Sequence, residues 1–365
     1  MKTTRLLLAL PVCAAILLAG CSKSKDNPAA YAVTVTAETG GTASADKTKA
    51  GAGATVKLTA EPKDGYVFKQ WIVQSGDVTL SPDAAANPAT FTMPAENVVV
   101  KAEFEAQTYA VTVTDDGNGT GKATVDGSDA VQAGEGDEVT LTATPKDGYA
   151  FKQWTVVSGG VTLSDATANP ATFTMPAKAV SVKAEFVEGV LINGIIWATR
   201  NVDAFGTFAA KPEAAGMFYQ WNRKKAWPST GTVTDWDSNN TGGEGDVWEV
   251  ANDPCPDGWR VPTKEEQAKL LETANVSNVW TTLNGVNGRK FTDKTSGKSI
   301  FFPATGYRHP GTGTLNYAGI NSFLWSSTSK STDSAWFMNF GSESAARQTS
   351  DNRAGGFIVR CVLQE

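Results

Sequence analysis

Apolar and polar residues alternate over most of residues 31–186. Val33 and Val35 lie on either side of Thr34, and the stretch VVVKAEF at 98–104 keeps the same two-residue period. This period predicts strands with one buried face, while the KDGY segments and the clusters of glycine and asparagine predict turns. No segment here has the spacing of a strong amphipathic helix, so the pattern predicts compact all-β structure.

The alternating segments occur twice. YAVTVTAETGG begins at Tyr31 and YAVTVTDDGNG at Tyr109, and both PKDGYVFKQW and NPATFTMPAENVVVKAEF return with few changes. The offset between the copies rises from 78 to 83 residues and ends at 82. An insertion therefore lies in the glycine-rich loop at 117–134, as a surface hairpin tolerates. The sequence predicts two β-repeats, 31–107 and 108–188.

Each repeat carries one tryptophan inside an apolar strand, Trp71 or Trp154. We expect these rings in the cores, and stacking on a ligand is the alternative. The segments DGYxFxxW, FTMP and KAEF resemble bacterial repeat domains of the divergent internalin B-repeat type, found on many surface proteins. The resemblance implies β-grasp-like modules used in tandem. The copies offer no nucleophile, metal cluster or phosphate loop, which favours a stalk over a dedicated binding site.

The pattern changes from about Val190, and nine of the eleven tryptophans lie beyond this point. The segment TKEE at 263–266 is a capping box, in which Thr263 caps a helix and Glu266 reaches back to it. This helix is expected to run to about Thr273. Few other segments of this region favour a helix. We therefore expect one or two short helices packed on an irregular, mostly antiparallel sheet.

Six motifs follow one another in residues 189–365, namely INGIIWATRNVDAFG, FYQWN, CPDGWRVPTKEE, FPATGYR, LWSSTSKSTDSAWFMNF and GGFIVRCV. Together they resemble the Fibrobacter succinogenes major paralogous domain. The resemblance implies a relation to the formylglycine-generating and C-type-lectin-like folds, in which a disulfide near the C-terminus closes the domain. We therefore expect an α+β C-type-lectin-like domain over 189–365.

The first 21 residues indicate export. The segment MKTTR is a positively charged N-terminal region, and LLLALPVCAAILL is an apolar core too short to span a bilayer permanently. The motif LAGC follows at the end of this apolar core. This order resembles the lipobox of bacterial lipoproteins. The resemblance implies a signal peptide at 1–20, a lipid such as palmitate on Cys21 and a tether at 21–30. Ser22 is not the aspartate that holds lipoproteins at an inner membrane, which favours the outer membrane and the cell surface. A thiol that merely follows an apolar helix is the alternative.

Cysteine usage predicts one disulfide. Cys13 leaves with the signal peptide and Cys21 takes the lipid, which leaves Cys255 and Cys361 in an oxidising compartment. A reactive thiol is the alternative, but neither cysteine has a histidine nearby in the sequence. We therefore expect a bond that ties the C-terminal strand to the body of the domain.

The tryptophan-rich segment at 227–254 is a candidate ligand-binding loop. Trp227, Trp236 and Trp248 alternate there with aspartate, asparagine and glycine. Aromatic faces beside carboxylates and amides suit the stacking of sugar rings whose hydroxyls are hydrogen-bonded at the edge. The alternative is that the three rings pack the loop against the domain.

The same loop offers a candidate calcium site. Asp235, Asp237, Asn239 and Asp246 stand at the first, third, fifth and twelfth positions of an EF-hand-like spacing. Asn240 occupies the place of the glycine that such a loop needs, and flanking helices are missing. A solvated acidic loop is the default reading, with calcium as the alternative and no other cofactor expected.

The formal net charge of −6 and the lack of a basic run argue against nucleic acid as a partner. Enzyme chemistry also lacks support, because both remaining thiols are needed for the disulfide and the only histidine, His309, lies in the turn-rich segment RHPGTG. A chance pair of carboxylates, as in a glycan-active enzyme, stays open. The sequence thus predicts a non-catalytic envelope lipoprotein that presents a lectin-like domain on a stalk for adhesion to glycans or proteins. A structural subunit of a surface fibre or envelope complex is the rival.

Overall fold

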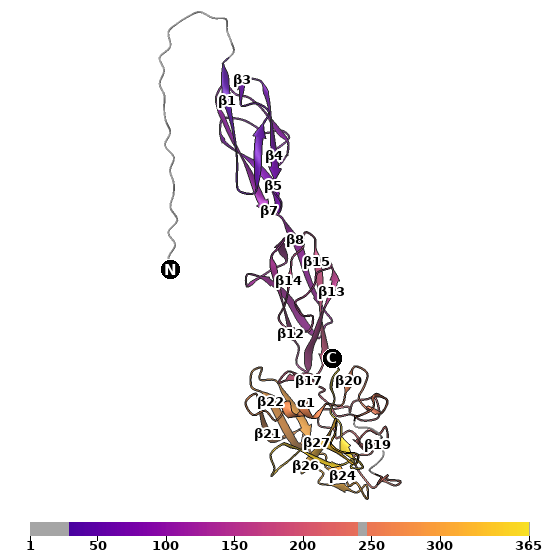
Figure 1. The fold of residues 1–365 in the computed structure, drawn as a ribbon. Helices are drawn as coiled ribbons and strands as arrows, with labels where there is room; N and C mark the ends of the chain where they lie inside the picture. Colours follow the sequence, from indigo (N-terminus) through magenta and orange to yellow (C-terminus); the bar gives the residue numbers. More distant parts are fainter. Residues whose placement is uncertain (1–28, 240–246, 365) are drawn as a thin grey trace, which may run out of the picture. The chain divides into compact units, whose positions relative to one another are not determined.

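The computed structural model describes residues 29–239 and 247–364. The chain divides into two compact units, the first ending at Gln107 and the second beginning at Thr108. The first unit holds one repeat, and the second holds the other repeat with the C-terminal domain (Figure 1). Within the described residues, no helix is long and apolar enough to cross a membrane.

The first repeat consists of two packed sheets. One has the order β3-β1-β7-β5 and the other the order β2-β4-β6. β1 and β7 pair in parallel, from Val33 opposite Val98 to Ala37 opposite Ala102, whereas the other pairs are antiparallel. The strands are β1 (Ala30–Ala37), β2 (Gly41–Ala45), β3 (Lys49–Gly51), β4 (Thr55–Pro62), β5 (Tyr66–Ser75), β6 (Ala89–Thr92) and β7 (Val98–Ala106).

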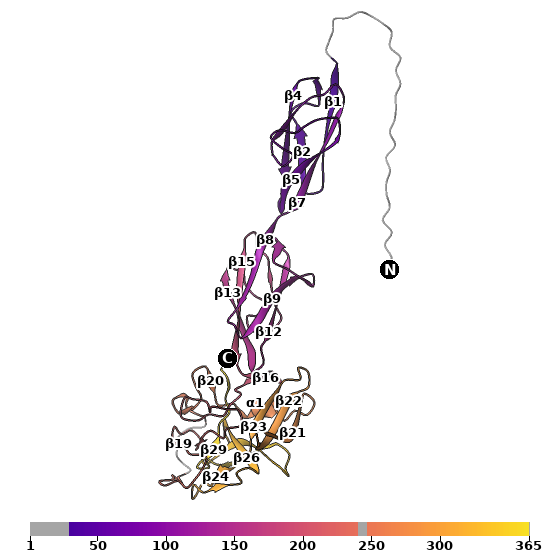
Figure 2. The same ribbon diagram turned by 180° about the vertical axis from the view of Figure 1, so that it is seen from behind.

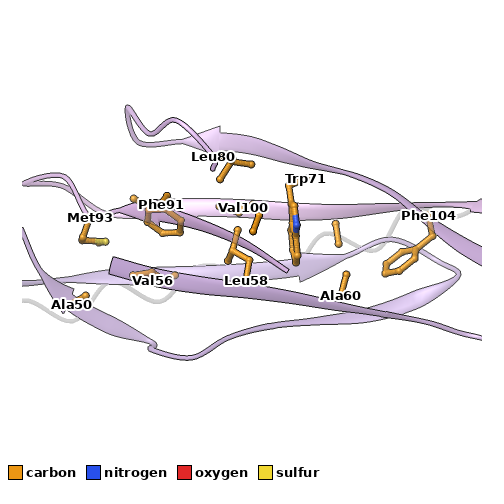
Figure 3. Packing of buried hydrophobic residues seen from close by; sticks show 14 residues of the cluster. Ala50, Val56, Leu58, Ala60, Trp71, Leu80, Phe91, Met93, Val100 and Phe104 are labelled. Atoms are coloured by element: carbon orange, nitrogen blue, oxygen red, sulfur yellow. The ribbon is translucent and has the colours of Figure 1, made fainter. Parts of the chain in front are cut away.

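The alternating pattern is clearest in β4 and β7, where every second residue from Val56 to Ala60 and from Val98 to Phe104 is buried. In β7, Val98 and Val100 are buried while the residue between them is only half-buried. Trp71 points between the two sheets beside Leu58 and Ala60 of β4 (Figure 3), and its Nε1 donates to the carbonyl of Ala86 at 3.1 Å. The predicted strands and the core position of the tryptophan are confirmed.

The second repeat has the same two-sheet architecture with one added hairpin. Its sheets have the orders β11-β8-β15-β13 and β10-β9-β12-β14. The inserted residues form a hairpin between β9 and β10, with the turn residues Asp126 and Gly127 at φ values of 49° and 77°. Trp154 is again buried in the core. The strands are β8 (Thr108–Asp115), β9 (Gly119–Val125), β10 (Ser128–Asp129), β11 (Gln132–Gly134), β12 (Glu138–Pro145), β13 (Tyr149–Ser158), β14 (Ala171–Thr174) and β15 (Val180–Glu188).

The β-grasp-like assignment of the repeats is wrong. A β-grasp domain packs a helix on its sheet, but the described residues of both repeats contain no helix. A second sheet covers the first instead. The reason is visible in the sequence, because the longest connections, at 76–88 and 159–170, contain proline and lack helical spacing.

The C-terminal domain combines several small sheets. Six strands form the sheet β19-β18-β29-β26-β27-β28, and the others form β16-β17-β30-β20, β21-β22-β23 and β24-β25. The strands are β16 (Val190–Ile192), β17 (Ile195–Trp197), β18 (Phe218–Tyr219), β19 (Ala226–Trp227), β20 (Trp259–Arg260), β21 (Val276–Leu283), β22 (Val286–Asp293), β23 (Ser299–Pro303), β24 (Tyr307–Arg308), β25 (Leu315–Asn316), β26 (Asn321–Ser329), β27 (Ser334–Gly341), β28 (Arg347–Asn352), β29 (Phe357–Ile358) and β30 (Val362–Leu363). Within this domain, β24 lies at the end opposite β16 and β17 (Figures 1 and 2).

Helices are nearly absent, so the α+β C-type-lectin-like class is wrong for this domain. The described residues hold one α-helix, α1 (Lys264–Lys269), and one 3-10 turn (Val250–Asn252). The capping box is present as predicted, because Glu266 N–H donates to Thr263 Oγ1 and Thr263 N–H donates to Glu266 Oε2. The helix stops before Thr273, since residues 271–275 form turns that lead into β21 and their threonine and asparagine are weak helix formers.

The predicted disulfide joins Cys255 to Cys361, whose Cα atoms lie 6.1 Å apart. Cys361 directly precedes β30, which pairs with β17 and β20. Both sulfurs lie in an apolar cluster with Trp221 and Val359. The bond therefore ties the end of the chain to the body of the domain.

Candidate ligand-binding surface

Trp227 and Trp248 do not present open faces. Trp227 is 4% exposed, packs against Trp236 at 4.8 Å between ring centroids, and donates its Nε1–H to Gln220. Trp248 is 7% exposed, packs on the edge of Trp221 and donates to the carbonyl of Asn252. The ligand-stacking prediction is therefore wrong for these two rings, which pack the loop against the domain as the alternative held.

Trp236 is half-buried and also uses its indole N–H internally. Its Nε1 donates to the carbonyl of Pro310 at 2.7 Å. A Cβ on Gly313 would lie 2.8 Å from the indole, so this ring needs a glycine beneath it. Trp236 thus connects the tryptophan-rich loop to the turn between β24 and β25, and it remains a candidate ligand contact only at its open edge.

A buried arginine fixes the start of the same loop. Arg308 is fully buried, and its Nε and Nη2 donate to the carbonyl of Pro228 at 2.9 and 2.6 Å. Its Nη2 also reaches the carbonyl of Thr230, and Nη1 donates to that of Gly313 at 2.7 Å. Burial lowers the pKa of Arg308 from its usual value. The guanidinium of Arg308 therefore donates hydrogen bonds to backbone carbonyls of two loops, where few strands are available to pair with these carbonyls.

One of the candidate calcium ligands, Asp237, is paired with a cation of the chain itself. Asp237 forms an ion pair with Arg223, and its other oxygen accepts from Asn239 N–H at 2.9 Å. That backbone hydrogen bond is the largest influence on the carboxyl, and together with the arginine it lowers the pKa of Asp237 although burial opposes them. Asp235 has a left-handed backbone with φ of 60°, and Asp246 lies outside the described residues. In the described ranges, no three His, Cys, Asp or Glu side chains gather around a common point that could hold a metal.

His309 lies exposed in the turn between β24 and β25. Its Nδ1 accepts from the N–H of Gly311 at 3.2 Å, which is a turn contact rather than the polarising contact of a catalytic base. Cys255 and Cys361 are consumed by their disulfide. The disulfide gives the two cysteines a structural role, and His309 Nδ1 contacts residues of its own turn.

The structure brings forward an aromatic pair that sequence reasoning missed. Tyr317, just after β25, is 57% exposed, and its ring stacks on that of Tyr307 at 6.1 Å with 14° between the planes. Tyr307 in turn packs on Phe323 and Phe357 of the core. No periodic signal marks LNYAGIN, because its conformation depends on contacts with β23 and β26. The pair thus consists of one exposed ring stacked on one anchored ring.

Comparison with known families assigns the whole described architecture. Residues 31–108 and 109–189 each match the family model of the divergent InlB B-repeat domain. Residues 190–363 match that of the Fibrobacter succinogenes major domain. A comparison with curated proteins found no match.

Proposed function

We propose that this chain, which carries two divergent InlB B-repeat domains followed by a Fibrobacter succinogenes major domain, is an envelope lipoprotein that presents its C-terminal domain for non-catalytic binding. Repeat domains of this kind suit a surface or structural protein. The apolar leader and LAGC motif support export and a lipid on Cys21, although both lie outside the described residues. A lipid on that cysteine would anchor the protein to a membrane, and Ser22 favours the outer membrane and the cell surface.

The observation that carries the binding role is the Tyr307–Tyr317 pair. Tyr307 belongs to β24 and Tyr317 directly follows β25, and β24 lies at the end of the C-terminal domain opposite β16, where the chain enters the domain. An exposed aromatic ring on a rigid support is typical of a contact surface for a glycan or a protein. The structural role of the cysteines and the turn contacts of His309 favour adhesion over catalysis.

Lipidation is tested by growing cells with a palmitate analogue and recovering the protein. We expect label on the wild-type chain and none on Cys21→Ser, while Cys13→Ser should be labelled normally because Cys13 leaves with the signal peptide. Equal labelling of the Cys21→Ser chain would refute the anchor.

Binding is tested with the full mature chain on a glycan array, run with calcium and with chelator, and by capture of envelope proteins. Retention of a defined glycan or protein supports presentation for binding. A well-folded chain that retains neither would refute it. A chelator-sensitive signal would restore the calcium site around Asp235 and Asp237.

One observation favours the rival role as a structural subunit. β21 is an eight-residue edge strand, VSNVWTTL, without charge, proline or bulge, and among the described strands it pairs only with β22. The other long edge strands, β5 and β13, carry lysines and register shifts that discourage pairing with another chain. If β21 pairs with a second copy, the mature chain should assemble in light scattering and Val279→Lys should keep it monomeric. A wild-type chain that stays monomeric at high concentration would exclude this role.

A further inference from the structure

Tyr317 has a backbone conformation that its side chain disfavours. Six non-glycine residues in the described chain have a positive φ, and five of them are asparagine or aspartate, which adopt this region most readily. Tyr317, with φ of 56°, is the exception. A bulky aromatic residue at such a position is a genuine outlier, and such outliers concentrate where a side chain must be aimed.

The surrounding backbone imposes this conformation. The carbonyl of Tyr317 accepts from the N–H groups of Ile320 and Asn321 at 3.1 and 3.0 Å, which closes a tight turn. Gly319 N–H donates to Ala304, and Gly306 N–H donates to Asn321. An asparagine would fit this turn with less strain, so folding alone gives no reason for tyrosine here.

The tyrosine side chain contributes little to the core. The residue is 57% exposed, although its ring rests on Tyr307, and the neighbouring Ile320 is 51% exposed. Tyr307 is held by Phe323 at 4.7 Å between centroids, and Phe357 stacks on Trp325 at 4.1 Å behind it. The exposed ring therefore has a rigid support, and its position is settled before any ligand arrives.

The chain segment that carries the ring suits an uncharged ligand with hydroxyl groups. Residues 310–329 contain no charged side chain. Amides lie along the loop instead, at Asn316 and Asn321, and Asn287 donates its Nδ2–H to Gly319 in the same turn. A neutral pyranose ring presents an apolar face of C–H groups to an aromatic plane and directs its hydroxyls to amides at the rim.

We propose that Tyr317 is the stacking residue of a binding site for neutral hexose units of a polysaccharide, supported from behind by Tyr307. This inference rests on the proposed binding function and names its ligand class. The conformational strain at Tyr317 is retained because the exposed ring serves the ligand rather than the fold.

The test compares binding and stability in the same variants of the full mature chain. Immobilised glucans, mannans and galactans serve as probes, with a polyuronate as the charged comparison. We expect Tyr317→Asn to weaken retention on the neutral polymer about tenfold or more, because it removes the stacking surface. Its thermal midpoint should stay within about 2 °C of wild type, because the turn accepts asparagine with less strain.

Phe205→Ala is the matched control, because Phe205 is another exposed aromatic residue, 44% accessible and far along the chain from this turn. It should bind like wild type. Undiminished binding by Tyr317→Asn would overturn the inference while leaving the proposed binding function intact. A wild-type chain that retains no neutral polymer but captures a protein through Tyr317 would overturn the carbohydrate assignment alone.

Discussion

The repeats and the C-terminal domain are stabilised in different ways. Within the described residues, every buried polar or charged side chain lies in the C-terminal domain, and the cores of the two repeats are apolar throughout. The repeats consist largely of strands of seven to ten residues that pair along their length, so the backbone satisfies its own hydrogen bonds. Many strands of the C-terminal domain have only two or three residues, which leaves loop carbonyls to be satisfied by side chains.

Buried arginines donate many of the hydrogen bonds that these loop carbonyls accept. Arg360 is fully buried and donates to Asn201 Oδ1 at 2.7 Å and to the carbonyls of Ala198, Thr199 and Phe301. Burial lowers the pKa of Arg360 to about 9. A regular sheet can thus rely on apolar area, whereas an irregular fold depends on a few donors that no apolar residue can replace.

Replacing Arg360 should have the largest effect on the difference in stabilisation between the C-terminal domain and the repeats. Arg360→Met keeps the volume but leaves several buried carbonyls without donors, so we expect the C-terminal domain to lose about 3 to 5 kcal/mol of unfolding free energy. Calorimetry of the mature chain should show this domain's transition shifted and those of the repeats unchanged. Lys290→Met, at an exposed position of β22, should change the free energy by less than about 0.5 kcal/mol. Equal effects of the two variants would contradict the role of Arg360.

The disulfide should stabilise only the C-terminal domain. Cys255 and Cys361 are 106 residues apart, so the bond restricts a long loop of the unfolded chain. We expect Cys255→Ser with Cys361→Ser to lower that domain's unfolding free energy by about 2 to 5 kcal/mol. The same calorimetric scan should leave the transitions of both repeats unmoved. A shift of all transitions would show that the domains unfold together.

The two repeats provide a finer comparison between near-identical cores. Trp71 Nε1 donates to the carbonyl of Ala86, whereas the buried Trp154 Nε1 finds no acceptor among the described residues. Trp71→Phe should therefore cost its repeat about 1 kcal/mol more than Trp154→Phe costs the other. Hydrogen exchange of peptides from β7 and β15 measures the two repeats separately. Equal costs would mean that the hydrogen bond of Trp71 adds nothing to stability.

Acidification should weaken the C-terminal domain through Glu266. Burial favours the neutral form of this carboxyl, but the hydrogen bonds and charge of Arg260 together with the hydrogen bonds of Thr263 outweigh it and lower the pKa of Glu266. The stabilisation is therefore complete above the pKa of the unfolded chain and is lost as the pH falls through the lower folded pKa. Unfolding midpoints measured between about pH 6 and pH 3 should fall more steeply in the wild type than in Glu266→Gln. Parallel curves would exclude this contribution.

Local patterns in the sequence predicted the parts of the fold that local physics determines. Alternation gave the strands of both repeats and the core position of Trp71, and TKEE gave the start of α1. The partners of buried polar groups could not be foreseen, because Arg308 and Pro228 are 80 residues apart. The tryptophan-rich loop was misread for the same reason, since composition does not reveal which rings face the core.

The candidate site was the least predictable part. The left-handed backbone of Tyr317 has no signature in its own residue type and arises from bonds to neighbours in the folded chain. Exposure of its ring also depends on Tyr307 and on the core behind it. Function at this position follows from tertiary structure, which a single sequence without strong periodicity does not disclose.

The parallel pairing of the first and last strands has a mechanical consequence. β1 and β7 run in the same direction and share five residue pairs, as do β8 and β15. The chain therefore enters a repeat at one end of this pair and leaves at the other. A force that pulls on the two ends loads the hydrogen bonds between the strands in shear, so they must break together rather than one at a time. Each repeat is thus arranged to resist stretching along the chain.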